Sequence, residues 1–294
     1  MLVPIFYHVD EFCKVFEATL NANSIAQQKQ RAATIPTLSL SEIITICIYY
    51  HYSGYKNFKA YYKSEVLIHL KSAFTKSVSY NRFIELKKNA ILPLALFLKI
   101  YCKANCTGIS FIDSFAIKVC HNRRIYSHKV FKNFAQRGQT SMGWFYGFKI
   151  HFIINHFGEI INFYITSGNI ADNNTNLLKK LTDNIIGKLF GDKGYIINQE
   201  LSTELYERGL QIITKIRKNM KNILMDINDK LFLRKRGTIE SSIGILKEYF
   251  SIEHSRHRSR PNFLCHIFSA LAAYCFKEDK PSIIRSDTLI EQSA

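Results

Sequence analysis

Acidic side chains are scarce in this chain of 294 residues. There are 23 Asp and Glu against 40 Lys and Arg, which gives a formal net charge of +17 at pH 7. An excess of this size attracts polyanions, so nucleic acid, an anionic membrane surface and acidic proteins are the candidate partners. Glycine and proline are also few, at 13 and five residues, which excludes a collagen-like or low-complexity chain.

Long hydrophobic runs are missing as well. A membrane-spanning helix needs about 20 consecutive apolar residues. The best candidates are residues 90–98, which are too few, and residues 263–276, which include His266. The first residues carry no basic segment and soon reach Asp10 and Glu11, which is not the pattern of a signal peptide. We therefore expect a cytoplasmic protein without a membrane segment.

The cysteines follow no disulfide pattern. Seven is an odd number, and the spacings are irregular. Cys102 and Cys106 form one C-x3-C pair, and Cys120-His121 follows, but a second pair that would complete a zinc site is missing. We expect free, mostly buried thiols, as is usual in a reducing cytoplasm.

The first hundred residues have the pattern of helices. Ser39 and Glu42 fit a capping box that opens an apolar helix, and Gly54 is a plausible end for it. A further, mostly apolar helix is predicted from about Tyr80 to Cys102. These helices indicate an all-α N-terminal region.

The helix predicted after Gly54 combines aromatic and basic side chains. At spacings of three and four, one face carries aromatic residues and a neighbouring face carries lysines, namely Tyr55, Phe58 and Tyr62, and Lys56, Lys59 and Lys63. One interpretation is a basic helix that lies along a DNA backbone. The other is a core helix with a solvated lysine edge, and the sequence leaves both open.

Strand-like segments begin after about residue 105. Short apolar runs between turn signals predict strands at 109–119, 144–155, 159–167, 188–190 and 210–216, and helices at 171–186, 198–208, 237–250 and 262–277. Segments 144–155 and 159–167 resemble a hairpin. Strands interleaved with helices indicate an α/β fold with a mixed sheet flanked by helices.

Two aspartates stand in unusual surroundings. Asp113 lies inside an apolar strand and is the only acid in residues 103–149, which hold eight Lys and Arg. A carboxylate there is costly unless it is paired or binds a cation. Asp192 lies between two glycines directly after a predicted strand, a common position for a site in an α/β sheet. A buried salt bridge for Asp113 and an ordinary turn for Asp192 are the alternatives.

Glu240 is the third isolated acid. Arg236, Glu240 and Lys247 are spaced so that they share one face of a predicted helix, and Gly244 lies on that face too. An ordinary ion pair between residues four apart is the alternative. Together with Asp113 and Asp192, however, Glu240 would supply the oxygen ligands that Mg²⁺ or Mn²⁺ prefers. Two such ions catalyse displacement at phosphorus, which fits a polyanionic substrate.

The chain resembles the DDE transposases of bacterial insertion sequences. It is most similar to insertion-sequence family nine-eight-two, related to the transposases with a Y-R-E-K signature. The resemblance rests on the order of several segments: LSLSEIITICIYYHYSGYKNFKAYY, FIDSFAIKVCHNRRIYSHKVFKNFAQRGQTSMGWFYGFKIHFIIN, SGNIADNN, GDKGY, RGTIESSIGILK and IEHSRHRS. It implies a ribonuclease H-like catalytic domain at 106–278, after a helical DNA-binding domain at 1–105 and before a polar tail at 279–294.

The resemblance also implies roles for single residues. Asp113, Asp192 and Glu240 match the catalytic, metal-binding triad, which holds Mg²⁺ or Mn²⁺, with two ions expected. Arg236 and Lys247 match the R and K of the signature and are expected to hold phosphates. Leu233 stands where the signature has tyrosine, so no tyrosine role is expected.

The implied activity is metal-dependent cleavage at the insertion-sequence ends, followed by strand transfer into target DNA. The expected partners are double-stranded DNA, as terminal inverted repeats and target, and a second copy of the chain in a homodimer or larger synaptic complex. Two alternatives stay open. One is a metal-dependent nuclease without strand transfer, and the other is an inactive DNA-binding repressor of its own element.

Other residues suggest contacts of their own. Three arginines lie within five residues and are expected to contact phosphate, namely Arg256, Arg258 and Arg260. Asp172 is expected to cap the helix that follows it. Trp144 is expected in the core of the sheet, with base stacking as the less favoured interpretation.

Overall fold

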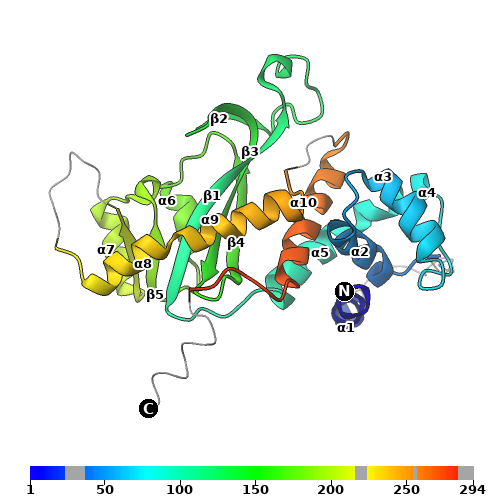
Figure 1. Ribbon diagram of the computed structural model, residues 1–294, viewed down its shortest axis with the longest axis horizontal. Helices are drawn as coiled ribbons and strands as arrows, with labels where there is room; N and C mark the ends of the chain where they lie inside the picture. Colours follow the sequence, from blue (N-terminus) through cyan, green and yellow to red (C-terminus); the bar gives the residue numbers. More distant parts are fainter. Residues whose placement is uncertain (24–36, 216–223, 254–256, 284–294) are drawn as a thin grey trace, which may run out of the picture. The chain divides into compact units, whose positions relative to one another are not determined.

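The computed structural model describes residues 1–23, 37–215, 224–253 and 257–283 (Figure 1). The chain forms two compact units. Unit 1 contains Met1–Cys102 and Leu246–Phe276, and unit 2 contains Lys103–Ile245 and Lys277–Ala294. The first change of unit lies close to the boundary expected near residue 105. The segment Leu246–Phe276 belongs to unit 1, however, although the sequence placed it with residues 106–278.

All regular elements in the described part of unit 1 are helical. The α-helices are α1 (Leu2–Asn23), α2 (Leu40–Tyr49), α3 (Phe58–Tyr61), α4 (Tyr80–Leu86), α5 (Ile91–Leu96) and α10 (Arg260–Cys275). Short 3₁₀ turns (Tyr50–Tyr52, Lys87–Ala90) and π-helical turns (Tyr62–His69, Phe97–Tyr101, Ile245–Tyr249) continue several of them. Ten consecutive or near-consecutive buried positions make α10 the central helix of this unit's core.

The capping box at the start of α2 is confirmed. The Ser39 hydroxyl accepts the backbone N–H of Glu42 at 3.1 Å, and the Glu42 carboxylate accepts the N–H of Ser39 at 2.7 Å. These two bonds satisfy amide groups that the first turn of a helix leaves without partners. Gly54 has a φ of +71°, which only glycine adopts readily, and it ends this helical segment.

Two of the helices predicted in the first hundred residues have different bounds in the structure, and the helix predicted at 171–186 covers only Thr175–Leu181. The Asn57 side chain accepts the N–H groups of Lys59 and Ala60, so α3 begins at Phe58, and Lys56 precedes the helix. The helix predicted from Tyr80 to Cys102 is divided into α4, a 3₁₀ turn, α5 and a π-helical turn. Pro93 lacks the N–H that a continuous helix would need at this point, which accounts for a break just before it.

Unit 2 is built on a mixed six-stranded sheet. The strands are β1 (Ile109–Cys120), β2 (Gln136–Thr140), β3 (Gly143–Asn155), β4 (Ile160–Ser167), β5 (Gly187–Gly191) and β6 (Leu210–Thr214). Their order is β2-β3-β1-β5-β6, and β4 pairs with β3 beyond the end of β2. The pairs β1/β3, β2/β3 and β3/β4 are antiparallel, whereas β1/β5 and β5/β6 are parallel. The mixed α/β architecture is therefore confirmed.

The helices of unit 2 are α6 (Thr175–Leu181), α7 (Gln199–Glu207), α8 (Ile227–Lys235) and α9 (Gly237–Gly244). One face of the sheet packs on α6 and α7, where a buried cluster includes Ile112, Leu178 and Leu205. The hairpin of β3 and β4 is confirmed. Strand β2 and helix α8 were not predicted. The sequence of β2, Gln-Arg-Gly-Gln-Thr, lacks the alternating apolar residues that identify a strand.

Three glycines, Gly138, Gly147 and Gly168, let the backbones approach closely at the point along β3 where its pairing with β2 ends and its pairing with β4 begins. A Cβ on Gly138 would collide with the carbonyl of Gly168, and a Cβ on Gly147 would collide with the carbonyl of Ile117 in β1. Any larger residue would push these backbones apart. The junction lies beside the loop of residues 168–173, which borders the site described below.

None of the helices in the described ranges combines the length and the apolar character that crossing a bilayer requires. All seven cysteines are free thiols, as expected, but the expectation that most are buried is wrong, because only Cys13, Cys47 and Cys265 are.

Candidate active site

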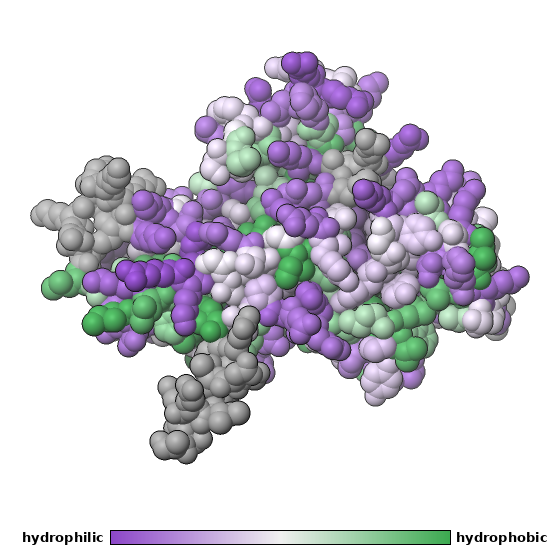
Figure 2. All heavy atoms as spheres, in the orientation of Figure 1, coloured by the Kyte–Doolittle hydropathy of each residue, from purple (hydrophilic) through white to green (hydrophobic). Residues whose placement is uncertain are grey.

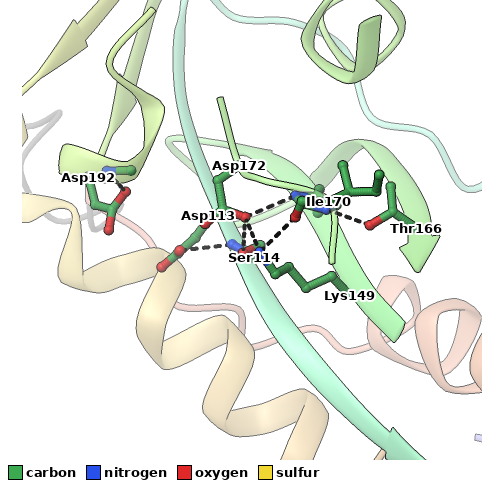
Figure 3. Close-up of polar contacts among 9 residues, drawn as sticks. Asp113, Ser114, Lys149, Thr166, Ile170, Asp172 and Asp192 are labelled. Atoms are coloured by element: carbon green, nitrogen blue, oxygen red, sulfur yellow. Dashed lines mark hydrogen bonds and ion pairs between the residues drawn. The ribbon is translucent and has the colours of Figure 1, made fainter. Parts of the chain in front are cut away.

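The register between β1 and β5 brings two of the three predicted acids together. Phe111 in β1 lies beside Phe190 in the parallel strand β5. Asp113 and Asp192 each follow this pair by two residues, so the two aspartates come at the same level, just beyond the paired part of the two strands. In Figure 3, Asp113 extends from β1 toward the side on which the Asp192 loop lies.

Asp192 is held by its own turn. Its Oδ1 accepts the N–H of Gly194 at 2.7 Å and caps a short 3₁₀ turn, Lys193–Tyr195. The preceding Gly191 is buried, and a Cβ there would lie only 3.0 Å from Tyr195 and 3.1 Å from Ile112. The glycines on either side of Asp192 thus allow a tight turn directly after the strand.

Arg236 joins the other two acids. Its Nη1 lies 3.1 Å from Asp113 Oδ2, and its Nη2 lies 2.5 Å from Glu240 Oε1. Arg236 connects α8 to α9, and the predicted spacing of four residues places it next to Glu240 on one helix face. The structure therefore joins Asp113 and Glu240 through Arg236, although the two acids lie 127 residues apart in the sequence, and Asp192 lies near enough to act on the charge of Asp113.

The environment of Asp113 disfavours its charge. The pKa of Asp113 is raised to about 6, chiefly by burial and to a smaller extent by the neighbouring carboxylates of Asp192 and Glu240. The backbone N–H of Ser114 and the Arg236 guanidinium act in the opposite direction. A carboxyl group with this balance gains strongly from an additional cation nearby.

A fourth carboxylate, Asp172, lies on the other face of β1. Ser114, next to Asp113, donates its hydroxyl to Asp172 Oδ1 at 2.9 Å, and Lys149 Nζ lies 3.1 Å from the same oxygen (Figure 3). Lys149 also donates to the carbonyl of Ile170 at 2.9 Å. The prediction that Asp172 caps α6 is wrong, because Asn174 supplies that cap.

His151 completes the Asp172 cluster without adding charge. It is fully buried, and its Nδ1 lies 3.5 Å from Asp172 Oδ1. Burial lowers its pKa below the ordinary 6.5, and Lys149 acts in the same direction, so the attraction of Asp172 is outweighed. His151 is therefore neutral at neutral pH, and Lys149 is the cation that balances Asp172. The signal for this cluster in the sequence is a lysine and a histidine inside an apolar strand.

The donor set fits a divalent cation in its chemistry. Asp113, Asp192 and Glu240 offer only hard oxygen atoms, and burial, helped by the two neighbouring carboxylates, raises the pKa of Asp113. Within the described ranges, no three His, Cys, Asp or Glu side chains are grouped closely enough to hold a metal ion. Instead, the guanidinium of Arg236 bridges two of the three acids.

The other predicted DNA contacts lie in unit 1, apart from Arg256, which is outside the described residues. Lys247 pairs with Glu253 at 2.7 Å. Five more are exposed, namely Lys56, Lys59, Lys63, Arg258 and Arg260. As DNA contacts, all of them stay predictions.

Unit 2 has an exposed basic segment of its own, between β1 and the end of β2. It contains Arg123, Arg124, Lys129, Lys132 and Arg137, all exposed, and no Asp or Glu occurs between Asp113 and Glu159. Figure 2 shows hydrophilic side chains over this part of unit 2, at the top of the view. The sequence indicated the positive charge of this segment but singled out none of its residues.

Comparison with known proteins agrees with this geometry. Residues 103–260, more than half of the chain, match the family model described as a transposase DDE domain. No curated protein and no solved structure matches the chain. The match spans all four residues that meet at the site, Asp113, Asp192, Arg236 and Glu240. The chain belongs to the transposase DDE domain family.

Proposed function

We propose that this protein is a DNA transposase that cuts DNA at the ends of an insertion sequence and joins the freed 3′ ends to target DNA. The observation that carries the proposal is that Arg236 pairs with both Asp113 and Glu240, while Asp192 lies near enough to Asp113 to raise its pKa, within a basic chain. The proposal includes a ribonuclease H-like catalytic fold and the kinship with insertion-sequence family nine-eight-two suggested by the sequence.

In this proposal, Asp113, Asp192 and Glu240 hold divalent cations, Mg²⁺ or Mn²⁺. The chemistry supplied by such cations is activation of the attacking oxygen and neutralisation of charge at phosphorus. Asp113 and Asp192 are fixed by β1 and by the turn after β5, so they preorganise one side of the centre. Glu240 is the most exposed of the three, at 58%, and sits on a helix, which leaves room for the DNA strand.

Arg236 has a second task in this proposal. Its guanidinium has five N–H donors, of which the contacts with Asp113 and Glu240 engage only part. The remaining donors can hold a phosphate oxygen beside the carboxylates. Exposed lysines and arginines of both units would bind the rest of the DNA backbone, and two copies of the chain would pair two DNA ends.

The test is DNA cleavage with Mg²⁺ by variants of the three acids. Asp113→Asn, Asp192→Asn and Glu240→Gln are each expected to lower the cleavage rate by more than about 100-fold, since changes even outside a metal's direct ligands cost 10- to 100-fold. DNA binding should persist, because these changes do not remove basic groups. The exposed Glu207 on α7 provides the control Glu207→Gln, which should cleave like the wild type.

A triad variant that cleaves normally would remove that residue from the centre. Strand transfer needs its own measurement, with pre-cut DNA ends and a supercoiled target. Joined products are expected from the wild type and not from Glu240→Gln. Efficient cleavage without any joined product would identify a nuclease and contradict the transposase.

A further inference from the structure

Unit 2 contains a pocket beside the Asp192 loop that the proposed chemistry does not use. Its volume is about 510 Å³, within the usual range for small-molecule sites. It is bordered by β2, by the start of β3 and by the loop of residues 168–173. Gly194, whose N–H holds the Asp192 carboxylate, also lines it, so the pocket reaches the backbone of the catalytic turn.

Trp144 lines this pocket and is the only tryptophan in the chain. The expectation that it belongs to the core is wrong, because the residue is 59% exposed. It lies opposite Gln139 on the edge hairpin of β2 and β3, where a core position is not available. The exposed indole ring is therefore available to a flat ligand at the edge of the pocket.

The other lining groups are polar and suited to hydrogen bonding. Arg137 and Gln139 are exposed, and neither makes a side-chain hydrogen bond or ion pair with the described residues. Asn169 accepts a bond from Ser167 through Oδ1, which leaves its amide group for other partners. The one acid of the lining, Asp172, is neutralised by Lys149 at 3.1 Å, so it does not repel an anionic strand.

A ring to stack on, amide groups and an arginine together match one kind of ligand. They fit a flat heterocycle with hydrogen-bonding edges and an adjacent phosphate, which is a nucleotide. In a duplex the faces of each base are covered by its neighbours, so a protein aromatic side chain reaches such a face only when the base is unstacked.

We propose that the pocket lined by Trp144, Arg137, Gln139 and Asn169 binds an unpaired nucleobase of the DNA strand next to the catalytic carboxylates. Trp144 stacks on the base, the amides of Gln139 and Asn169 contact its edge, and Arg137 contacts a neighbouring phosphate. This inference rests on the proposed function, because the base belongs to the DNA strand that the protein would cleave at the site of Asp113, Asp192 and Glu240.

The single tryptophan makes the test direct, since its emission reports on this pocket alone. Glu240→Gln, which should bind but not cut, is titrated with two labelled DNAs of equal length. One is a blunt duplex, and the other carries a three-nucleotide single-stranded end. Anisotropy of the label measures binding, and tryptophan emission measures stacking. We expect quenching with the single-stranded end and little change with the blunt duplex.

Variants supply the matched comparison. Trp144→Ala should weaken binding of the single-stranded end by about 5- to 150-fold, the range for loss of one stacked base, and blunt duplex much less. Trp144→Phe should restore most of the difference. Tyr206, an aromatic residue 70% exposed on α7, provides the control Tyr206→Ala, which should bind like the parent.

The outcomes separate this inference from the proposed function. DNA binding with unchanged tryptophan emission, or with equal quenching by both DNAs, overturns the pocket and leaves the transposase standing. Equal affinities of Trp144→Ala and Tyr206→Ala for the single-stranded end also overturn the pocket and leave the transposase standing. Absence of DNA binding by the parent and by the wild type overturns both.

Discussion

Lys149 offers the sharpest test of how unit 2 is stabilised. Its side chain is 9% exposed and pairs with Asp172, which is 28% exposed, while its Nζ also donates to the carbonyl of Ile170. Lys149→Met keeps the length of the side chain and removes the charge. Asp172 then keeps the hydroxyl of Ser114 but loses its cation, because His151 beside it is neutral.

The expected cost is about 2–3 kcal/mol of unfolding free energy. Removing one partner of a fully buried pair costs about 3–5 kcal/mol, and the partial exposure of Asp172 reduces that value. Urea denaturation, followed by far-ultraviolet circular dichroism, measures the change. The double variant Lys149→Met/Asp172→Asn should cost about 1–2 kcal/mol less than the sum of the two single variants. Once Asp172 is neutral, loss of the Lys149 charge no longer leaves a carboxylate without its counter-charge.

An exposed pair provides the control. Lys179 and Glu204 are 42% and 39% exposed, so Lys179→Met should change the unfolding free energy by less than about 1 kcal/mol. A cost for Lys149→Met no greater than that for Lys179→Met would refute the assignment of Lys149 as the counter-charge of Asp172. Strict additivity in the double variant would refute it too.

Three further predictions concern stability and use the same denaturation measurement. Ser39→Ala should cost about 1 kcal/mol, because it removes the cap of α2, and an unchanged midpoint would contradict the capping role. Gly147→Ala should cost at least about 1–3 kcal/mol through its collision with Ile117, whereas Gly244→Ala, in a helix with open space around the new Cβ, should gain about 0.5–1 kcal/mol. Burial lowers the pKa of His151 in the folded state, so below pH 6.5 the unfolded chain binds a proton that the folded chain does not. Stability should therefore fall as pH falls from 6.5, by up to about 1.4 kcal/mol per pH unit from this residue, and His151→Gln should show a shallower fall between pH 7 and pH 5.

Periodicity located most of the elements in the sequence. β1, β3, β4 and the capped start of α2 are strongly patterned, and their observed bounds lie within one or two residues of the predicted ones. β2 escaped detection because a polar edge strand is stabilised by pairing with β3 and not by its own side chains. The helix predicted from Tyr80 to Cys102 is divided at the 3₁₀ turn Lys87–Ala90, just before Pro93, whose missing backbone donor the apolar composition concealed.

By itself, the sequence determined the charge of this protein, the strands that carry Asp113 and precede Asp192, and the helix face shared by Arg236 and Glu240. These features depend on composition or on residues a few positions apart, where local geometry is fixed by the period of a helix or strand. Only the tertiary structure decided which groups meet across long separations. It placed Arg236 between two acids, gave Lys149 to Asp172 and left Trp144 exposed beside a pocket. Such outcomes follow from strand order and register, which are set by the packing of the whole sheet and not by any local segment.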